Sequence, residues 1–167
     1  IIKNSGIIVY GNFIIILSFF ILLSGLSSFG VGILYKRFFP SSQELNEKQN
    51  LFYSQFIIHI FFVFILSLCV FIFQDILKQI LFDNRIEFNI IYPIIFFILN
   101  VVHTQLSNYF RYSSKMIPYT LSTTIAPYLV IFGIIYSFYF YNLDINTLFI
   151  INNVSYLIVT SILFYYV

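Results

Sequence analysis

Long runs of apolar residues, separated by short polar segments, make up most of the chain. A helix needs about 20 mostly apolar residues, each rising about 1.5 Å, to cross roughly 30 Å of hydrocarbon. Five segments meet this requirement, and the pattern predicts membrane spans at residues 12–35, 55–74, 90–110, 117–141 and 145–167. The runs are too long and too unbroken for the alternating pattern of a membrane β-barrel. We therefore expect an all-α, polytopic transmembrane helix bundle.

The polar segments between these runs predict how the helices connect. Residues 40–50 form a polar loop. Residues 75–87 form an amphipathic connector whose apolar residues recur at helical spacing, namely Ile76, Leu77, Ile80 and Leu81. The links at residues 111–115 and 142–146 are short. Short links place the helices that they join side by side and antiparallel.

The composition supports a membrane protein. Of the 167 residues, 60% are hydrophobic and 8% are charged, and the mean hydropathy is +0.97. A soluble domain carries about a quarter charged residues, so this chain needs lipid as its solvent. The net charge of +2 is too small to indicate a nucleic-acid partner. Because the chain begins with Ile1 and stops inside an apolar run, we expect residues 1–167 to be a single transmembrane domain, truncated at both ends.

The distribution of Lys and Arg predicts the orientation. Cytoplasmic loops are enriched in these residues. The loops after the first and third spans carry five of them, and the other face of the bundle carries three. The five are Lys36, Arg37, Lys48, Arg111 and Lys115. We expect the face that holds these five to be cytoplasmic.

Polar residues inside two spans predict helix contacts or a hydrated cavity. In the first span, Ser24, Ser28 and Gly32 recur every four residues, which favours close approach of another helix. In the third span, four polar residues lie within an arc of roughly 60° at about 100° per residue. These four are Asn100, Thr104, Ser107 and Arg111. Such a stripe indicates a face that is turned either to other helices or to a hydrated cavity.

Three further residues inside the spans have both a structural and a functional interpretation. Pro127 predicts a bend in the fourth span, where nearby hydroxyls can bond the carbonyl that proline leaves free. His59 and His103 lie in different spans, and each is either a hydrogen-bonded structural histidine or a proton carrier. The sequence contains no catalytic or metal-ligating motif that we recognise, and no cofactor is expected. The patterns therefore favour a membrane protein that is not an enzyme.

Two stretches resemble a known family. "YGNFIIILSFFILLSGLSSFGVGILYKRFFP", from Tyr10 to Pro40, resembles the second transmembrane helix of the bacterial polysaccharide flippases. These proteins export O-antigen and capsule repeat units and belong to the multidrug/oligosaccharidyl-lipid/polysaccharide exporter superfamily. "QLSNYFRYSSKMIPYTLSTTI", from Gln105 to Ile125, is similar to the short basic link between the fourth and fifth helices of that family. The other segments match in length and order, so the chain resembles helices two to six of the N-terminal lobe of a two-lobed flippase.

This resemblance implies a function, a location and partners. Such proteins flip undecaprenyl-pyrophosphate-linked oligosaccharide repeat units across the bacterial cytoplasmic (inner) membrane by alternating access. The cargo needs cations for its pyrophosphate and polar groups for its sugars. The residues that the resemblance suggests for the cations are Lys36, Arg37, Arg111 and Lys115, and those for the sugars are Asn100, Thr104 and Ser107. Polysaccharide polymerases and glycosyltransferases of the same pathway are the implied protein partners.

Two alternatives stay open at this point, beside a purely structural or receptor-like helical bundle. A cation-coupled multidrug exporter of the same superfamily needs an acidic residue inside the lobe, whereas Asp75 and Asp144 lie at span ends. A membrane-embedded enzyme of polysaccharide biosynthesis, either a polymerase or an acyltransferase, needs Arg, His or acidic residues gathered in one loop or cavity. The predicted outer loops offer few such residues.

Overall fold

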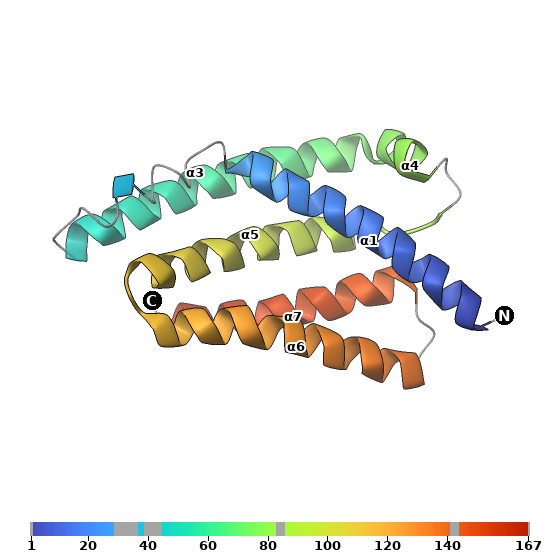
Figure 1. Cartoon of the computed structure of the whole chain (residues 1–167). Helices are drawn as coiled ribbons and strands as arrows, with labels where there is room; N and C mark the ends of the chain where they lie inside the picture. Colours follow the sequence, from blue (N-terminus) through green and yellow to red (C-terminus); the bar gives the residue numbers. More distant parts are fainter. Residues whose placement is uncertain (1, 29–36, 39–44, 83–85, 141–143, 167) are drawn as a thin grey trace.

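The computed structural model describes residues 2–28, 37–38, 45–82, 86–140 and 144–166. The part of the chain that it describes is helical (Figure 1), and its helices are α1 (Ile2–Ser27), α3 (Leu45–Ile72), α4 (Gln74–Phe82), α5 (Ile91–Tyr112), α6 (Met116–Phe140) and α7 (Ile145–Tyr166). The predicted all-α class is confirmed. Within the described residues each predicted span overlaps one long helix, although Gln74 at the end of the second span begins α4.

Two of the long helices begin earlier than the hydrophobic pattern predicts. Helix α1 begins at Ile2 and α3 at Leu45, ten residues before the predicted starts at residues 12 and 55. At α3 the backbone continues its own hydrogen bonds into a polar flank, whereas at α1 the apolar segment itself begins earlier, at Gly6. The predicted end of the first span, residues 29–35, lies outside the described residues.

Four helices of the described chain are long and apolar enough to cross a membrane. The qualifying segments are Gly6–Ser27, Asn46–Ile72, Met116–Tyr139 and Ile145–Tyr166. Helix α5 has a similar length but does not meet the criterion, because it carries polar residues such as Asn100, His103 and Gln105. It is the central helix, packed against α1, α3, α6 and α7 (Figure 1). Its neighbours therefore provide the apolar outer surface that α5 lacks.

The outer surface of the bundle is apolar over much of its area. Exposed side chains include Phe64 on α3, Phe132 on α6 and Phe164 on α7, which are 66%, 70% and 53% exposed. Soluble proteins rarely expose such extensive apolar surface, whereas a lipid bilayer solvates it. The fold thus defines a helical membrane protein.

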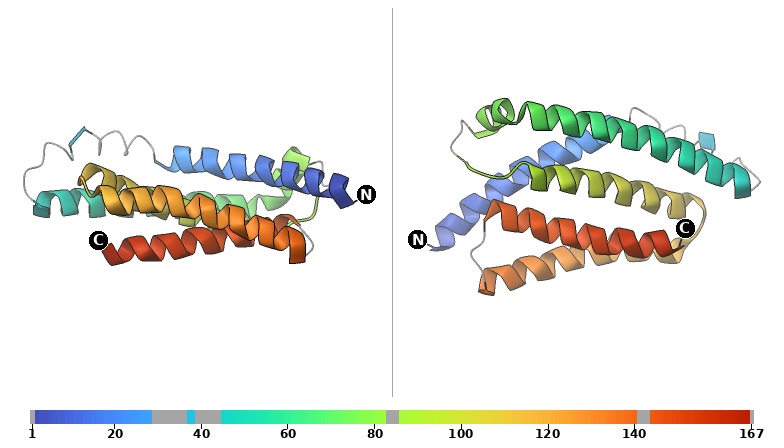
Figure 2. Two further views of the ribbon diagram at one scale, coloured as in Figure 1. Left: turned by 60° about the horizontal axis from the view of Figure 1, so that its bottom comes forward. Right: turned by 180° about the vertical axis from the view of Figure 1, so that it is seen from behind.

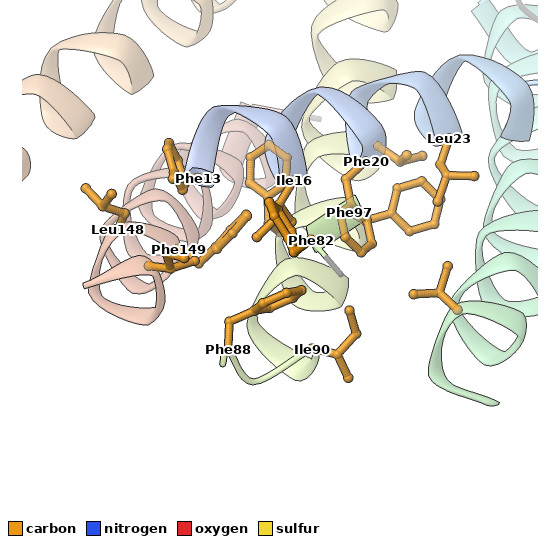
Figure 3. Close-up of a cluster of buried hydrophobic side chains, with 14 of the residues drawn as sticks. Phe13, Ile16, Phe20, Leu23, Phe82, Phe88, Ile90, Phe97, Leu148 and Phe149 are labelled. Atoms are coloured by element: carbon orange, nitrogen blue, oxygen red, sulfur yellow. The ribbon is translucent and has the colours of Figure 1, made fainter. Parts of the chain in front are cut away.

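The largest core cluster joins α1 to α5 and α7. Helix α1 crosses its neighbours diagonally (Figure 2) and buries Phe13, Ile16, Phe20 and Leu23, which recur at helical spacing. Figure 3 shows these side chains lying on the side of α1 that faces the bundle. The ring of Phe13 meets that of Phe149 edge-on, with 4.9 Å between centroids. This aromatic packing fixes where α1 crosses the bundle.

The predicted amphipathic connector is helix α4. Its residues Leu77 and Leu81 pack against the core cluster, and Phe82 is buried in it. Ile76 and Ile80 are instead 53% and 77% exposed. The apolar side predicted from the spacing is thus divided between the protein core and the surface.

Pro127, where the sequence predicts a bend, lies inside α6. Proline removes the bond that would end on the carbonyl of Thr123. The hydroxyl of Thr123 donates to the carbonyls of Tyr119 and Thr120, at 3.1 and 3.2 Å. It therefore bonds the preceding turn rather than the carbonyl that Pro127 leaves free.

Candidate functional site

A polar pocket lies between α1, α3 and α5. Its volume is about 450 Å³. Its described lining is almost entirely polar or small, and consists of Ile21, Ser24, Gly25, Ser28, Gln55, His59, Asn100, Thr104, Gln105, Asn108 and Tyr112. We call this cavity the polar pocket. In a chain that is 60% hydrophobic, this concentration of hydroxyl, amide and imidazole groups makes it the candidate site.

The small residues of α1 leave room for the pocket. Gly25 lines it, and a Cβ atom added there would find no neighbouring atom within 4 Å. The small-residue ridge predicted close contact with another helix, and its Ser24 does bond Asn100 of α5, whereas Gly25 beside it borders open space. Gly32, which also belongs to the predicted ridge, lies outside the described residues.

His59 is the hydrogen-bonded centre of the pocket wall. It is only 4% exposed and lies on α3, one turn after Gln55. Its Nε2 atom lies 2.7 Å from the hydroxyl of Ser27 on α1, and its Nδ1 atom is hydrogen-bonded to the side-chain amide of Gln105 on α5. One imidazole thus links three helices.

The direction of these hydrogen bonds follows from their donors. The hydroxyl of Ser27 donates its one hydrogen to the carbonyl of Ser24, at 2.8 Å. It can therefore only accept from His59, so Nε2 must carry the proton. The Nδ1 atom then accepts from the amide nitrogen of Gln105. The arrangement is that of a neutral imidazole with the proton on Nε2.

A second polar link closes the pocket between α1 and α5. The amide of Asn100 donates to the hydroxyl of Ser24 at 3.2 Å, and this hydroxyl donates to the carbonyl of Phe20 at 2.9 Å. Asn108 and Thr104 continue the same side of α5 toward its end. Asn100 and Thr104, which were predicted to contact sugars, therefore both line the pocket.

Ser107 departs from the predicted stripe, because it does not line the polar pocket. It is buried against α6, where its hydroxyl lies 2.9 Å from that of Ser122. Ser122 donates to the carbonyl of Tyr119, so Ser107 is the donor in this pair. At about 100° per residue, Ser107 lies roughly 60° from Thr104 around the helix. That rotation moves it from the pocket to the neighbouring helix.

The predicted cations lie apart from the pocket lining. Arg37 and Arg111 are exposed, and the Arg111 guanidinium lies 5.9 Å from the ring centroids of both Tyr112 and Tyr119. The ammonium of Lys115 lies 5.9 Å from the ring of Tyr109. Since Tyr112 also lines the pocket, it connects Arg111 to the pocket wall.

Lys36 and Lys48 are the other two basic residues that were predicted on the cytoplasmic face. Lys36 lies outside the described residues. Lys48 lies near the start of α3, at the same end of the bundle as the α5 to α6 turn (Figure 1). The loops after the first and third spans were predicted to lie on one membrane face. The basic residues that the structure describes there lie at one end of the bundle.

The second histidine has a different environment. His103 is 8% exposed, and its ring stands edge-on to Tyr156 of α7, with 5.1 Å between centroids. It does not appear among the residues that line the polar pocket. The two histidines therefore belong to separate parts of the bundle.

The polar pocket is built from neutral groups. Its described lining contains no carboxylate, and each acidic residue that the structure describes lies at or beyond a helix end: Glu47, Asp75, Glu87 and Asp144. Within the described part of the chain, no group of three His, Cys, Asp or Glu residues is placed to hold a metal ion. Amides and hydroxyls both donate and accept hydrogen bonds, so the pocket suits a neutral ligand that also does both.

Sequence reasoning missed part of this lining. Gln55, Gln105 and Tyr112 were not singled out, and His59 was noted without being assigned to the pocket. Gln55 and His59 stand four residues apart, which places them on one face of α3. That spacing was a usable signal. The pairing of this face with α1 and α5 could not be read from it.

A larger cavity lies at the opposite end of the bundle. Its volume is about 640 Å³, and Lys78, Glu87, Asn89 and Asn146 contribute to its lining. The backbone N–H of Asn89 donates to the side-chain oxygen of Asn146 at 3.0 Å. This contact ties the segment before α5 to the start of α7, so we interpret the cavity as part of the interhelical connections.

Comparisons with protein-family models, curated proteins and solved structures find no match to this chain. The class of protein is therefore defined by the fold and the site: a helical membrane protein with a neutral polar pocket inside its apolar bundle.

Proposed function

We propose that the chain forms part of a transporter that flips lipid-linked oligosaccharide across a bacterial cytoplasmic membrane by alternating access. The observation that carries this proposal is the polar pocket, bounded by α1, α3 and α5. Sugars present many hydroxyl groups, each of which both donates and accepts hydrogen bonds. The amides of Asn100 and Asn108 and the hydroxyl of Thr104 offer the matching partners.

The basic end of the bundle supports the same proposal. Arg111 adjoins the pocket through Tyr112, and Lys115 follows in the turn after α5. A pyrophosphate carries negative charge, which Arg and Lys attract. In this proposal the anionic headgroup contacts Arg111, Lys115 and Arg37 near the membrane surface, while the sugars enter the pocket.

The position of the acidic residues favours this cargo over a multidrug cation. An exporter of cations that exchanges them for Na⁺ or H⁺ on a carboxylate needs that carboxylate within a span. The described acidic residues lie at or beyond helix ends, and the described pocket lining is neutral. Neutral hydrogen-bonding groups fit a polyhydroxylated cargo better than a lipophilic cation.

The test is transport of a fluorescent undecaprenyl-pyrophosphate oligosaccharide in proteoliposomes that contain the full-length protein. We expect Thr104→Val and Asn108→Leu to slow flipping. Thr123→Val is the matched control, because its exposed hydroxyl bonds only its own helix in the described contacts. Equal flipping rates of Thr104→Val and Thr123→Val would show that the polar pocket does not bind the sugars of the cargo. No flipping by the wild type, with the cognate repeat unit supplied, would refute the flippase function.

Arg111→Ala tests the headgroup contact separately. We expect it to slow flipping of the pyrophosphate-linked sugar, while folding is retained. Arg111→Lys is the conservative comparison, because it keeps the charge but loses the planar guanidinium. Unimpaired flipping by Arg111→Ala would reduce this residue to a topological anchor.

A further inference from the structure

The hydrogen bonds of His59 depend on its protonation state. In the observed arrangement Nε2–H donates to Ser27 and Nδ1 accepts from the amide of Gln105. A protonated imidazole donates from both nitrogens. The bond to Ser27 survives protonation, whereas the Nδ1–H would point at the amide N–H of Gln105, donor against donor. The structure therefore accommodates a proton on Nδ1 only if the Gln105 side chain changes its orientation.

A turn of the Gln105 amide resolves this conflict. Rotation by about 180° brings the side-chain oxygen to Nδ1–H, where it accepts the new hydrogen bond. The amide N–H₂ then leaves its former position. Gln105 and His59 both line the polar pocket, so this rotation changes the end of the amide that is not bonded to His59 from the oxygen, an acceptor, to the N–H₂, a donor. Protonation thus changes the hydrogen-bonding pattern that the pocket offers to a ligand.

The surroundings of His59 contain few other ionisable groups. The pocket residues contributed by α1 are Ile21, Ser24, Gly25 and Ser28, which do not titrate, and α3 adds Gln55. From α5 the one described titratable group in the lining is the phenol of Tyr112, with the Arg111 guanidinium 5.9 Å from its ring centroid. His59 is therefore the one described lining group that changes charge near neutral pH.

We propose that His59 is a proton-binding site that couples proton binding to cargo binding in the polar pocket. A proton on Nδ1 reorients Gln105 and replaces the neutral hydrogen bond between α3 and α5 with a charge-assisted one, while the link to α1 through Ser27 remains. Coupling is reciprocal, so a cargo that prefers one orientation of Gln105 changes the affinity of His59 for the proton. The inference rests on the proposed function for its cargo, and the proton site itself can be measured without one.

The first measurement follows the imidazole directly in the full-length protein. Solid-state ¹⁵N NMR of histidine-labelled protein in liposomes, without cargo, reports which ring nitrogens are protonated as pH is lowered. The His59 signal is assigned by its loss in His59→Gln and its retention in His103→Gln. We expect the Nε2–H tautomer at high pH and a doubly protonated ring at low pH. The Nδ1–H tautomer at high pH, or no protonation while the protein stays folded, would overturn the inference.

The second measurement follows flipping of fluorescent undecaprenyl-pyrophosphate oligosaccharide. We expect the wild-type rate to change about tenfold between about pH 5 and 8, where imidazole changes charge. His59→Gln should lose this dependence, and His103→Gln should retain it. A wild-type pH dependence in His59→Gln would overturn the coupling. Protonation of His59 by NMR with no flipping at any pH would preserve the proton site but refute the proposed function.

Discussion

Gly133 of α6 lies directly against Ile151 of α7. A Cβ atom added to Gly133 would stand 2.5 Å from Cγ2 of Ile151. Real side chains do not approach this closely, so the glycine permits a helix separation that any larger residue would prevent. Helices α6 and α7 are also neighbours in sequence, joined across residues 141–143.

Gly133→Ala should therefore destabilise the protein by roughly 1–3 kcal/mol, the usual range for a group forced into a packed interface. The reason is that Ile151 is branched at Cβ and cannot simply turn aside. Unfolding in mixed detergent micelles measures the change. Gly11→Ala is the control, because its added Cβ would meet no atom within 4 Å. Equal stability of the two variants would show that α6 and α7 do not pack closely at Gly133.

The hydroxyls of Ser107 and Ser122 join α5 to α6 within the bundle. A double-mutant cycle with Ser107→Ala and Ser122→Ala should give a coupling free energy of about 0.6 kcal/mol, as is typical of interhelical hydrogen bonds in membranes. Ser161 provides a comparison, because it is exposed and its hydroxyl donates to Leu157 of its own helix. A cycle of Ser107→Ala with Ser161→Ala should give a coupling near zero. Additive effects of the Ser107 and Ser122 variants would contradict the described contact.

The turn from α5 to α6 depends on Ser114, whose φ angle is 60°. The backbone N–H of Lys115 reaches the carbonyl of Phe110 at 3.0 Å, as in a Schellman termination. A left-handed conformation costs about 1–2 kcal/mol for an L residue, against roughly 0.5–1 kcal/mol for the extra freedom of glycine when unfolded. Ser114→Gly should thus raise the melting temperature slightly, and Ser114→Val should lower it. A stabilising Ser114→Val would refute the left-handed turn.

Asp144 caps the first turn of α7. Its carboxylate accepts a hydrogen bond from the backbone N–H of Thr147 at 2.7 Å. Asp144→Ala should cost about 0.5–2 kcal/mol of stability, whereas Asp144→Asn retains a side-chain acceptor and should cost less. Thermal unfolding of the two variants against wild type checks this order. Equal losses in both would indicate that the charge, rather than the cap, stabilises the helix.

Much of the fold was predictable from the sequence because each long helix carries its own signal. Hydrocarbon thickness sets a minimum apolar length, and α6 and α7 begin and end within one residue of the predicted spans. The polar start of α3 was missed because helical backbone satisfies its own hydrogen bonds beyond the apolar run. The start of α1 was missed because the predicted span left out apolar residues that follow Gly6.

The candidate site was predictable only in part. The spacing of Asn100, Thr104 and Ser107 correctly indicated a polar face on α5. It could not show that this face is divided, with Thr104 in the pocket and Ser107 against α6. Periodicity gives the angle between residues on one helix, but not the direction from which each neighbouring helix approaches.

The sequence by itself determined the helical class, the membrane environment and the short links, because these follow from local composition and from the length that hydrocarbon requires. Only the tertiary structure decided that His59 bonds Ser27 and Gln105, residues 32 and 46 positions away in the chain. The bulky core residues of α1 set where it crosses α5, and that crossing brings Ser24 to Asn100. The sequence sets the spacing of polar groups along each helix, and side-chain packing between helices decides which of these groups meet.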